Sequence, residues 1–389
     1  MDKKMILAAM KKNAMLIVLV LVLIFFAAMT GGGILSPSSI TELINQNAYV
    51  YILGAGMLMC MLTGGNIDLS CGSFVCLLGA FGGVFMIVSK MSTGLSILLL
   101  LLIGVAYGVL LGVLIAYVHI PPWIATLAGY LSFRGLGTSI LSSNSTTGSL
   151  APFPEDFRNI FYGRVFPTEK GTLNLPCFVF GLAAAALVVF LLFWNRKSRL
   201  KKGYIADSFN VTLGKSVAGA AVIVAVMTLL ALDGGIPTTL LWVLGIILIF
   251  TFITSKTTIG RHFYVVGGNI EAARLSGVNT KRIMFIAYLN MAVLTTIATF
   301  TVVARSQSAY ADVGKNFEMD AISACVVGGV SASGGAGTVL GMVIGATLIG
   351  VINLGMSLIS LDANYQRVIK GFVLLAAVVF DIVSKKRNK

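Results

Sequence analysis

Residues 95–118 read LSILLLLLIGVAYGVLLGVLIAYV, an apolar run without one charged side chain. A helix needs roughly 17–25 such residues to cross the hydrocarbon core of a bilayer. Lipid favours helices because every backbone amide then finds its hydrogen-bond partner inside the same segment. This stretch therefore predicts a membrane-spanning helix.

Runs of the same kind recur along the chain, and the alternation of apolar and polar residues that a β-barrel needs does not appear. Ten runs are clear: 14–29, 48–62, 69–88, 95–118, 178–194, 217–232, 240–253, 283–304, 339–359 and 368–383. Two more segments, 123–141 and 321–329, are short or rich in small residues. The whole chain of 389 residues is 57% hydrophobic and 11% charged, which excludes ordinary soluble folding. We expect one all-α polytopic membrane domain over 1–389 with about 10–12 transmembrane helices, some of them short or broken.

The residues that catalysis or metal binding would need are sparse. The five cysteines (Cys60, Cys71, Cys76, Cys177 and Cys325) form no CxxC pair, and the two histidines lie far apart. The stretch FNVTLGKS at 209–216 lacks the leading glycine of a phosphate-binding loop. We therefore expect no cofactor, no metal and no enzymatic activity, so that any ATP hydrolysis resides on a partner subunit.

The net charge of +14 is concentrated beside the apolar runs, in four clusters at 3–12, 196–215, 256–282 and 385–389. Positive residues gather on the cytoplasmic side of short loops, where they also meet anionic lipid headgroups. We expect both termini, a basic loop over 195–215 and a loop over 254–282 in the cytoplasm, and no nucleic acid partner. Residues 1–30 have the charge pattern of a signal peptide, but FFAAMTGGG is a poor cleavage site, so we expect a retained first helix.

The longest polar stretch is SSNSTTGSLAPFPEDFRNIFYGRVFPTEKGTLN, within 142–175, and we expect it outside the cell. A loop beyond about 12–15 residues in a compact protein is usually functional or disordered. Its aromatic residues (Phe153, Phe157, Phe161, Tyr162 and Phe166) favour a docking surface or a cap over a vestibule. The alternative, a structured loop without a function of its own, remains open.

Two glycine-rich segments, GGNIDLSCGSFVCLLGA (64–80) and FEMDAISACVVGGVSASGGAG (317–337), share one pattern. In each, an aspartate (Asp68 or Asp320) precedes an apolar run of small residues, which lets helices approach closely in a membrane. Each aspartate suits a helix N-cap, and each also suits a translocation path or gate. The candidate path residues are Asn66, Asp68, Ser70, Asp320 and Ser323. The likeness of the two segments is typical of an internal duplication.

A polar segment, GGNIEAARLSGVNTKRIMF (267–285), separates two apolar runs. Asn269 suits an N-cap, Glu271 the first turn and Gly277 the end of a short helix, after which Thr280 suits the cap of the next helix. Such a short helix is marginal alone and needs a surface to pack on. Ala272, Ala273 and Leu275 predict either a plug for a groove on a cytoplasmic partner or a loop helix lying on the headgroups.

The segment GRHFYVVGGNIEAARLSGVNTKRI resembles the EAA…G coupling loop of ATP-binding-cassette importer permeases, in the ribose-type sugar permease family. GGNIDLSCGSF, PPWIATLAGYLSFRG, YQRVIKGFVLLAAVVFD and the long stretch ARSQSAYADVGKNFEMDAISACVVGGVSASGGAGTVLGMVIGATLIGVINLGM match in order. The insertion over 150–235 makes the chain similar to the xylose or multiple-monosaccharide branch.

The resemblance implies a type II importer-like permease in the bacterial plasma (inner) membrane. It implies that Glu271, Ala272, Ala273 and Gly277, with the neighbouring Leu275, contact a cytoplasmic ATP-binding-cassette subunit. The resemblance also implies that Gly260 and Gly267–Gly268, which precede this motif, are glycines because the turns there require them. A second permease copy and an extracytoplasmic sugar-binding protein complete the implied assembly.

The implied cargo is a monosaccharide such as xylose, galactose or ribose. Import of a nucleoside or a furanosyl signal molecule by the same family is the first alternative. An ion-coupled secondary transporter is the second, and it needs charged groups in the middle of its spans. The long spans here are nearly free of charge, which disfavours ion coupling.

Overall fold

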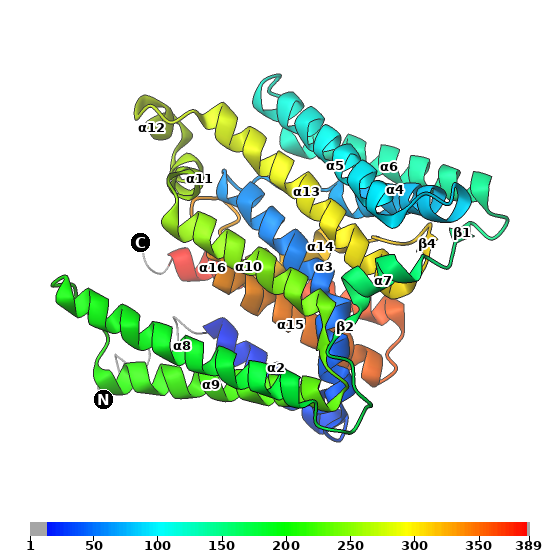
Figure 1. Ribbon diagram of the computed structural model, residues 1–389. Helices are drawn as coiled ribbons and strands as arrows, with labels where there is room; N and C mark the ends of the chain where they lie inside the picture. The colour runs from blue at the N-terminus through cyan, green and yellow to red at the C-terminus, as the bar shows by residue number, and fades with distance from the viewer. Residues whose placement is uncertain (1–13, 387–389) are drawn as a thin grey trace.

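The structure, a computed structural model, describes residues 14–386, and these residues are mostly helical (Figure 1). The long helices are α2 (Ala14–Met29), α3 (Pro37–Leu62), α5 (Thr93–Ala116), α6 (Pro122–Asn144), α8 (Leu175–Lys201), α9 (Phe209–Leu232), α10 (Thr238–Lys256), α13 (Thr280–Ser306), α15 (Val339–Leu358) and α16 (Ala363–Lys386). The shorter ones are η1 (Gly33–Leu35), α4 (Cys71–Gly83) with its continuation η2 (Val84–Val88), α7 (Glu155–Tyr162), α11 (Thr258–Gly268), α12 (Ile270–Leu275) and α14 (Phe317–Val327).

Seven helices in the described part of the chain are long and apolar enough to cross a membrane. They are Cys71–Val88, Thr93–Ala116, Leu175–Lys201, Phe209–Leu232, Thr238–Lys256, Thr280–Ser306 and Val339–Leu358. The remaining apolar runs of the sequence lie in α2, α3 and α16, and the two short segments lie in α6 and α14. The prediction of an all-α polytopic membrane protein is confirmed.

Helix α3 is the centre of the fold, with α10, α13, α14 and α15 packed around it. Glycines make this close packing possible, because a Cβ added at Gly56 would lie 2.6 Å from Met291 Sδ of α13. Polar side chains join α3 to α15, since Asn47 donates a hydrogen bond to the Ala346 carbonyl (2.7 Å) and Tyr51 bonds with Thr347 (2.9 Å).

Helices α8 and α9 form a hairpin at the edge of the molecule (Figure 1). The two helices pack mainly on each other, and α9 also packs on α3. Their outward side chains, such as Val179 and Val222, are apolar and exposed, as lipid contact requires.

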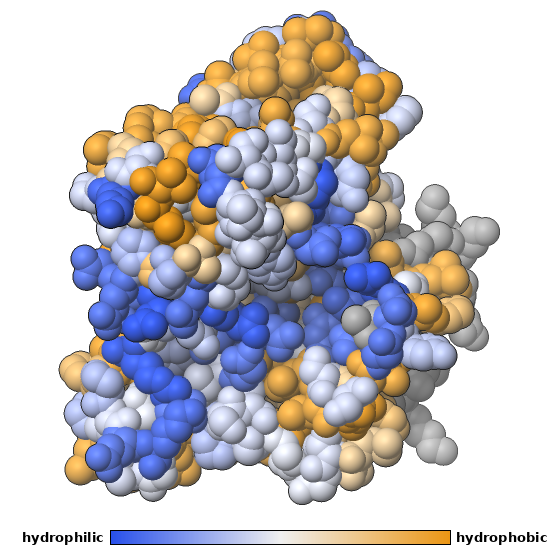
Figure 2. Space-filling model, turned by 90° about the vertical axis from the view of Figure 1, so that its right-hand side faces the viewer, coloured by the Kyte–Doolittle hydropathy of each residue, from blue (hydrophilic) through white to orange (hydrophobic). Residues whose placement is uncertain are grey.

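The two ends of the molecule differ, and Figure 1 shows them on its right and left sides. The right-hand end, which we name the α7 end, holds α7 with the strands β1 (Ser149–Leu150), β2 (Arg164–Val165), β3 (Ile236–Pro237) and β4 (Ala309–Tyr310). β1 pairs antiparallel with β4 (Ser149 opposite Tyr310), and β2 pairs antiparallel with β3 (Arg164 opposite Pro237). Seen face-on, this end carries a hydrophilic band between apolar margins (Figure 2).

The loop over 142–175 is folded at the α7 end, and most of its aromatic residues are internal. Phe153, Phe157 and Phe161 are buried, and they stack among themselves and with Phe300 and Trp242. Phe166 remains exposed. The expectation of an aromatic docking surface therefore does not hold for these three residues, which form a small core of their own.

The left-hand end, which we name the α12 end, holds α11, α12 and the connection from α8 to α9 (Figure 1). Basic residues at 196–202 and 256–282 therefore lie toward one end, opposite the loop over 142–175. The basic residues at 3–12 and 387–389 lie outside the described residues.

Candidate functional site

Helix α12 is built from the local signals expected of it. The Asn269 side chain accepts a hydrogen bond from the Ala272 amide (3.0 Å), and Glu271 lies in the first turn, where a negative charge complements the helix dipole. Gly277 has a φ of 81°, the left-handed conformation that glycine adopts after a helix. The cap of α13 is Asn279, whose side chain accepts from the Arg282 amide (3.0 Å), one residue before the expected Thr280.

The two alanines of α12 point to opposite environments. Ala273 is fully buried in the central hydrophobic core, whereas Ala272 is exposed and Leu275 is 89% exposed. Ala273 therefore fastens the helix to its own chain and is not part of an outer apolar surface. The outer surface consists of Glu271, Ala272, Arg274 and Leu275, which we name the α12 outer face.

The segment that leads into α12 rests on backbone, because glycines remove the side chains that would separate it. A Cβ added at Gly267 would lie 1.7 Å from the Leu62 carbonyl oxygen at the end of α3. The Gly335 amide donates a hydrogen bond to the same oxygen (3.2 Å). A Cβ added at Gly65 would lie 2.0 Å from the Ala332 carbonyl oxygen, and one added at Gly334 would lie 2.4 Å from the Gly64 Cα. We name Gly64, Gly65, Gly267, Gly334 and Gly335 the glycine junction.

Glycines around this junction do not all serve one purpose. A Cβ at Gly260 would clash with the Ile253 carbonyl, but one at Gly268 would meet nothing within 4 Å. None of Gly260, Gly267 and Gly268 has a positive φ. Close approach, and not turn geometry, is therefore what requires glycine at Gly260 and Gly267.

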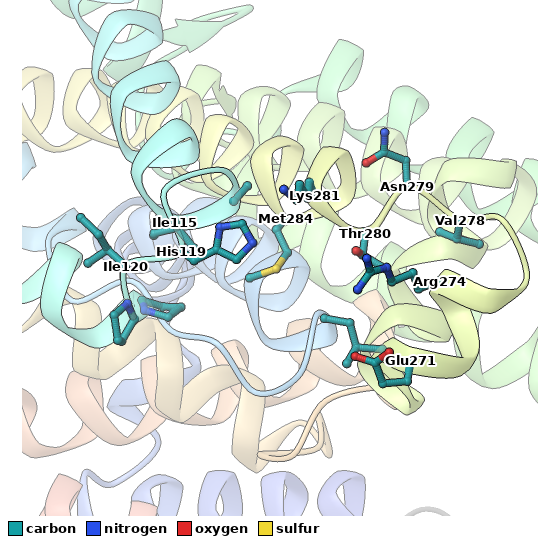
Figure 3. A pocket seen from close by; sticks show the side chains of 14 residues that line it. Ile115, His119, Ile120, Glu271, Arg274, Val278, Asn279, Thr280, Lys281 and Met284 are labelled. Carbon is teal, nitrogen blue, oxygen red and sulfur yellow. The ribbon is translucent and has the colours of Figure 1, made fainter.

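A cavity of about 570 Å³ lies between α12 and the connection from α5 to α6. In Figure 3, Glu271 and Arg274 border it on one side and His119 and Ile120 on the other, with Met284 of α13 between them. The His119 Nδ1 bonds with the Tyr117 carbonyl (2.7 Å), which holds the ring at the rim. The lining mixes acidic, basic and apolar groups, as a protein-docking surface does.

Sequence reasoning missed this second wall. This wall comes from a segment some 150 positions before α12, which contains His119, Pro121 and Pro122. No local sequence pattern indicates that the two segments lie side by side. The usable signal was the break in apolar character at HIPP, between two long helices.

The first group of candidate path residues lies before α4. The Asp68 Oδ1 accepts a hydrogen bond from the Ser70 amide (2.8 Å), and the Ser70 hydroxyl in turn bonds with the Tyr107 hydroxyl (2.6 Å). Asn66 donates to the Thr63 hydroxyl (3.0 Å). Asp68 therefore orders the turn that leads into α4, but the N-cap position belongs to Ser70 and carries no side-chain cap bond, so Asp68 is not the cap that the sequence suggested.

The second group lies on α14, where capping does not explain Asp320. Asn316 holds the N-cap position, and Asp320 sits within the helix. Its carboxylate accepts hydrogen bonds from Lys370 of α16 (3.1 Å to Oδ1) and from the Tyr49 hydroxyl of α3 (2.6 Å to Oδ2). Asp320 and Ser323 also line a second cavity, between α14 and α16. No hydrogen bond in the described part of the chain joins the two groups of path residues.

Comparison with known proteins places the chain among transport permeases. The model of the family described as branched-chain amino acid transport system / permease component matches residues 39–378. The xylose transport system permease protein XylH of Haemophilus influenzae is 33% identical over 360 residues, covering 92% of both chains. XylH of Escherichia coli (strain K12) is 31% identical over 92% of this chain and 88% of its own. The ribose import permease protein RbsC of Bacillus subtilis is 31% identical over 89% of this chain and 85% of its own.

No solved structure matches the chain. The family match extends over most of the helices described above, from α3 into α16. The relatives are permease subunits of transport systems and not enzymes. The chain belongs to this permease-component family, which includes the xylose and ribose permeases.

Proposed function

We propose that this chain is the membrane subunit of an importer that carries a monosaccharide into the cell, driven by a separate cytoplasmic ATP-binding-cassette subunit. The xylose and ribose permeases among its relatives support a sugar as the cargo. The observation that carries the coupling mechanism is the geometry of α12: its inner side is fixed to the core through Ala273, and Leu275 projects almost fully into the surroundings.

The ATPase subunit binds the α12 outer face and the neighbouring cavity. Leu275 supplies an apolar anchor, and Glu271 and Arg274 beside it supply charged contacts that set orientation. When ATP binding closes the ATP-binding subunits on each other, α12 moves with the subunit to which it is bound. The glycine junction transmits this displacement to the Leu62 end of α3 and to the 331–337 loop, because the backbone atoms of these segments are in direct contact there.

The protein spans the bacterial inner membrane with its α12 end and both termini in the cytoplasm and with its α7 end outside. The basic residues gathered toward the α12 end support this orientation. A second permease copy and an extracytoplasmic sugar-binding protein complete the transporter, and the binding protein docks on the α7 end. A nucleoside or furanosyl cargo, handled by the same machinery, is the alternative that a cargo screen separates.

Leu275→Asp tests the docking role, in the transporter reconstituted with its ATPase and its binding protein. The variant places an anion in an apolar contact, so we expect uptake of D-xylose and D-ribose and sugar-stimulated ATP hydrolysis to fall together by about tenfold or more. The matched control is Ile205→Asp, because Ile205 is 94% exposed in the connection between α8 and α9 at the same end. Equal activity of both variants and the unmodified transporter contradicts the docking role of α12.

Labelling a cysteine introduced at Ser145 tests the orientation. A membrane-impermeant thiol reagent added to intact cells is expected to label Ser145→Cys, since this residue follows α6 in the loop at the α7 end. The five native cysteines are buried and contribute little background. Labelling that requires cell lysis contradicts the orientation.

A further inference from the structure

A cavity of about 360 Å³ lies between α14 and α16. Polar and charged side chains lie around a surface that is mostly apolar, and the lining residues are Asn316, Met319, Asp320, Ser323, Arg367, Lys370, Gly371 and Leu374. The volume falls in the range of about 300–1,000 Å³ that small-ligand sites occupy. Helix α14 follows β4 directly in the chain, so the cavity belongs to the half of the molecule that ends at the α7 end.

Helix α16 presents two unlike sides, and the charged side faces this cavity. Arg367 and Lys370 line it, whereas Val368, Phe372 and Leu375 are exposed on the rest of the helix. Charged side chains on a membrane helix are costly and are retained where they face a water-filled space or a transported solute. Lys370 is bound to Asp320, whereas the hydrogen bond of Arg367 is a long one to Asn364 (3.4 Å), so guanidinium donors of Arg367 remain available at the cavity.

Two further polar groups line the cavity without protein partners. Within the described part of the chain, neither the Asn316 amide nor the Ser323 hydroxyl has a hydrogen-bond partner. Ser323 is only 5% exposed. Buried polar groups are normally hydrogen-bonded, so an unpaired group that lines a cavity indicates water or a ligand there.

The groups around the cavity suit an occupant with several hydroxyl groups. The Asp320 carboxylate is neutralised by Lys370 and held by Tyr49, so its position is fixed. What remains available is an amide, a hydroxyl and one guanidinium, together with the apolar surfaces of Met319 and Leu374. This set matches a molecule with several hydroxyl groups on one side and C–H groups on the other.

We propose that the cavity between α14 and α16 is a binding site for a neutral monosaccharide, which lies between Ser323 and Asn316 on one wall and Arg367 on the other. This proposal rests on the proposed import function, since it places the imported sugar on its route through the membrane. The Asp320–Lys370 pair holds the two helices together, and the free polar groups bond the sugar hydroxyls.

Sugar protection of an introduced cysteine tests the site directly. Gly371 lines the cavity, and a Cβ there would meet nothing within 4 Å, so Gly371→Cys adds a thiol without a clash. In the reconstituted transporter, we expect D-xylose or D-ribose to slow its labelling by a water-soluble thiol reagent at least about threefold, as a largely occupied site requires. L-leucine at the same concentration has no such effect, and the labelling of Ser145→Cys in the surface loop is unchanged by any of the three.

Uptake by two cavity variants supplies the second readout. Ser323→Ala removes the hydroxyl, and Asn316→Gly removes the amide at a residue whose φ of 67° glycine adopts without strain. We expect each to lower uptake about five- to tenfold, as loss of one hydrogen bond to a sugar does, and to change the ratio of xylose to ribose uptake. Val368→Ala, on the exposed side of α16, leaves uptake and the ratio unchanged.

The two measurements separate this site from the import function. Sugar uptake by the unmodified transporter, without protection of Gly371→Cys and with normal uptake by both cavity variants, overturns the site and leaves the import function standing. Protection by sugars in a transporter that imports neither of them supports the site and overturns the proposed function for these two cargoes. Protection by L-leucine and not by the sugars overturns both.

Discussion

The α12 end and the α7 end are held together by opposite means. At the α12 end, the segment leading into α12 meets α3 and the 331–337 loop through backbone atoms, because glycines stand at the contact points. At the α7 end, the connecting segments meet through bulky side chains: the aromatic cluster around Phe157 and the pairing of Arg164 with Asp233 (2.7 Å between Nη2 and Oδ2).

This difference has a mechanical meaning. Side chains change rotamer and absorb small displacements, but two backbones in direct contact have no torsion left between them to do so. A push on α12 is therefore transmitted with little loss, whereas the α7 end tolerates adjustment when another protein docks or leaves. Four predictions test the contrast.

The largest effect is expected at Gly267. A Cβ in Gly267→Ala would lie 1.7 Å from the Leu62 carbonyl oxygen, so α11 must leave its position. We expect a loss of more than about 5 kcal/mol in stability, which removes folded protein from the membrane. Yield and thermal unfolding of the detergent-solubilised protein measure this.

The adjacent Gly268→Ala is the control, because its Cβ meets nothing within 4 Å and alanine has a higher helix propensity than glycine. It should fold as well as the unmodified protein. If both variants behave alike, the contrast between the two ends disappears.

The next effect separates the two sides of α12. Ala273→Asp places a carboxylate without a partner in the central core, so we expect a loss of about 4 kcal/mol or more in stability, seen as a lower unfolding temperature. Ala272→Asp, on the exposed side, keeps the unfolding temperature and lowers only ATPase-driven uptake. Similar unfolding temperatures for the two variants indicate that α12 is not fastened through Ala273.

At the α7 end, Phe157→Ala is expected to remove about 3–5 kcal/mol of stability, since it opens a void inside a packed aromatic cluster. Unfolding followed by tryptophan fluorescence reports this, because Trp242 stacks on the neighbouring Phe161. Phe166→Ala, at an exposed ring, is the control. A Phe157 variant as stable as this control shows that the aromatic cluster does not hold the α7 end together.

The smallest effect concerns Asp233. Burial alone would raise the pKa of this carboxyl, but hydrogen bonds from Arg164, Thr41 and Lys170 hold the pKa below its usual range. A pKa lower in the folded than in the unfolded chain contributes stability above the unfolded value of about 3.9, and this stability is lost as pH falls through the folded value. Asp233→Asn should therefore be less stable by about 1–2 kcal/mol at neutral pH.

The pH dependence of this difference is the measurement. The gap in unfolding temperature between Asp233→Asn and the unmodified protein should stay constant from about pH 8 to about pH 5 and shrink below about pH 4. A gap that shrinks already between pH 8 and pH 5 contradicts the lowered pKa.

Local signals in the sequence predicted the spans and the ends of α12 well. Apolar length marks a span wherever the chain meets lipid, and Asn269 and Gly277 act on neighbouring backbone groups. The Asp68 contact is also local, because its partner Ser70 is two residues away, although it forms the turn before α4 and not the cap.

Long-range contacts were out of reach. Nothing near Asp320 indicates Lys370, fifty positions later, as its partner. A six-residue helix shows too few turns to reveal which side is buried, so Ala272 and Ala273 looked equivalent. The aromatic residues near Phe157 looked like a surface because their partners Phe300 and Trp242 come much later in the chain.

The α8–α9 hairpin bears on the order in which the protein assembles during synthesis. Its two helices are consecutive in the sequence and pack mainly on each other, so the pair can form as soon as α9 has left the ribosome. Helix α3 packs on α9 and α10, but its partners α13, α14 and α15 are made more than two hundred residues after it. The central helix therefore obtains its full set of neighbours only well after the peripheral pair is complete.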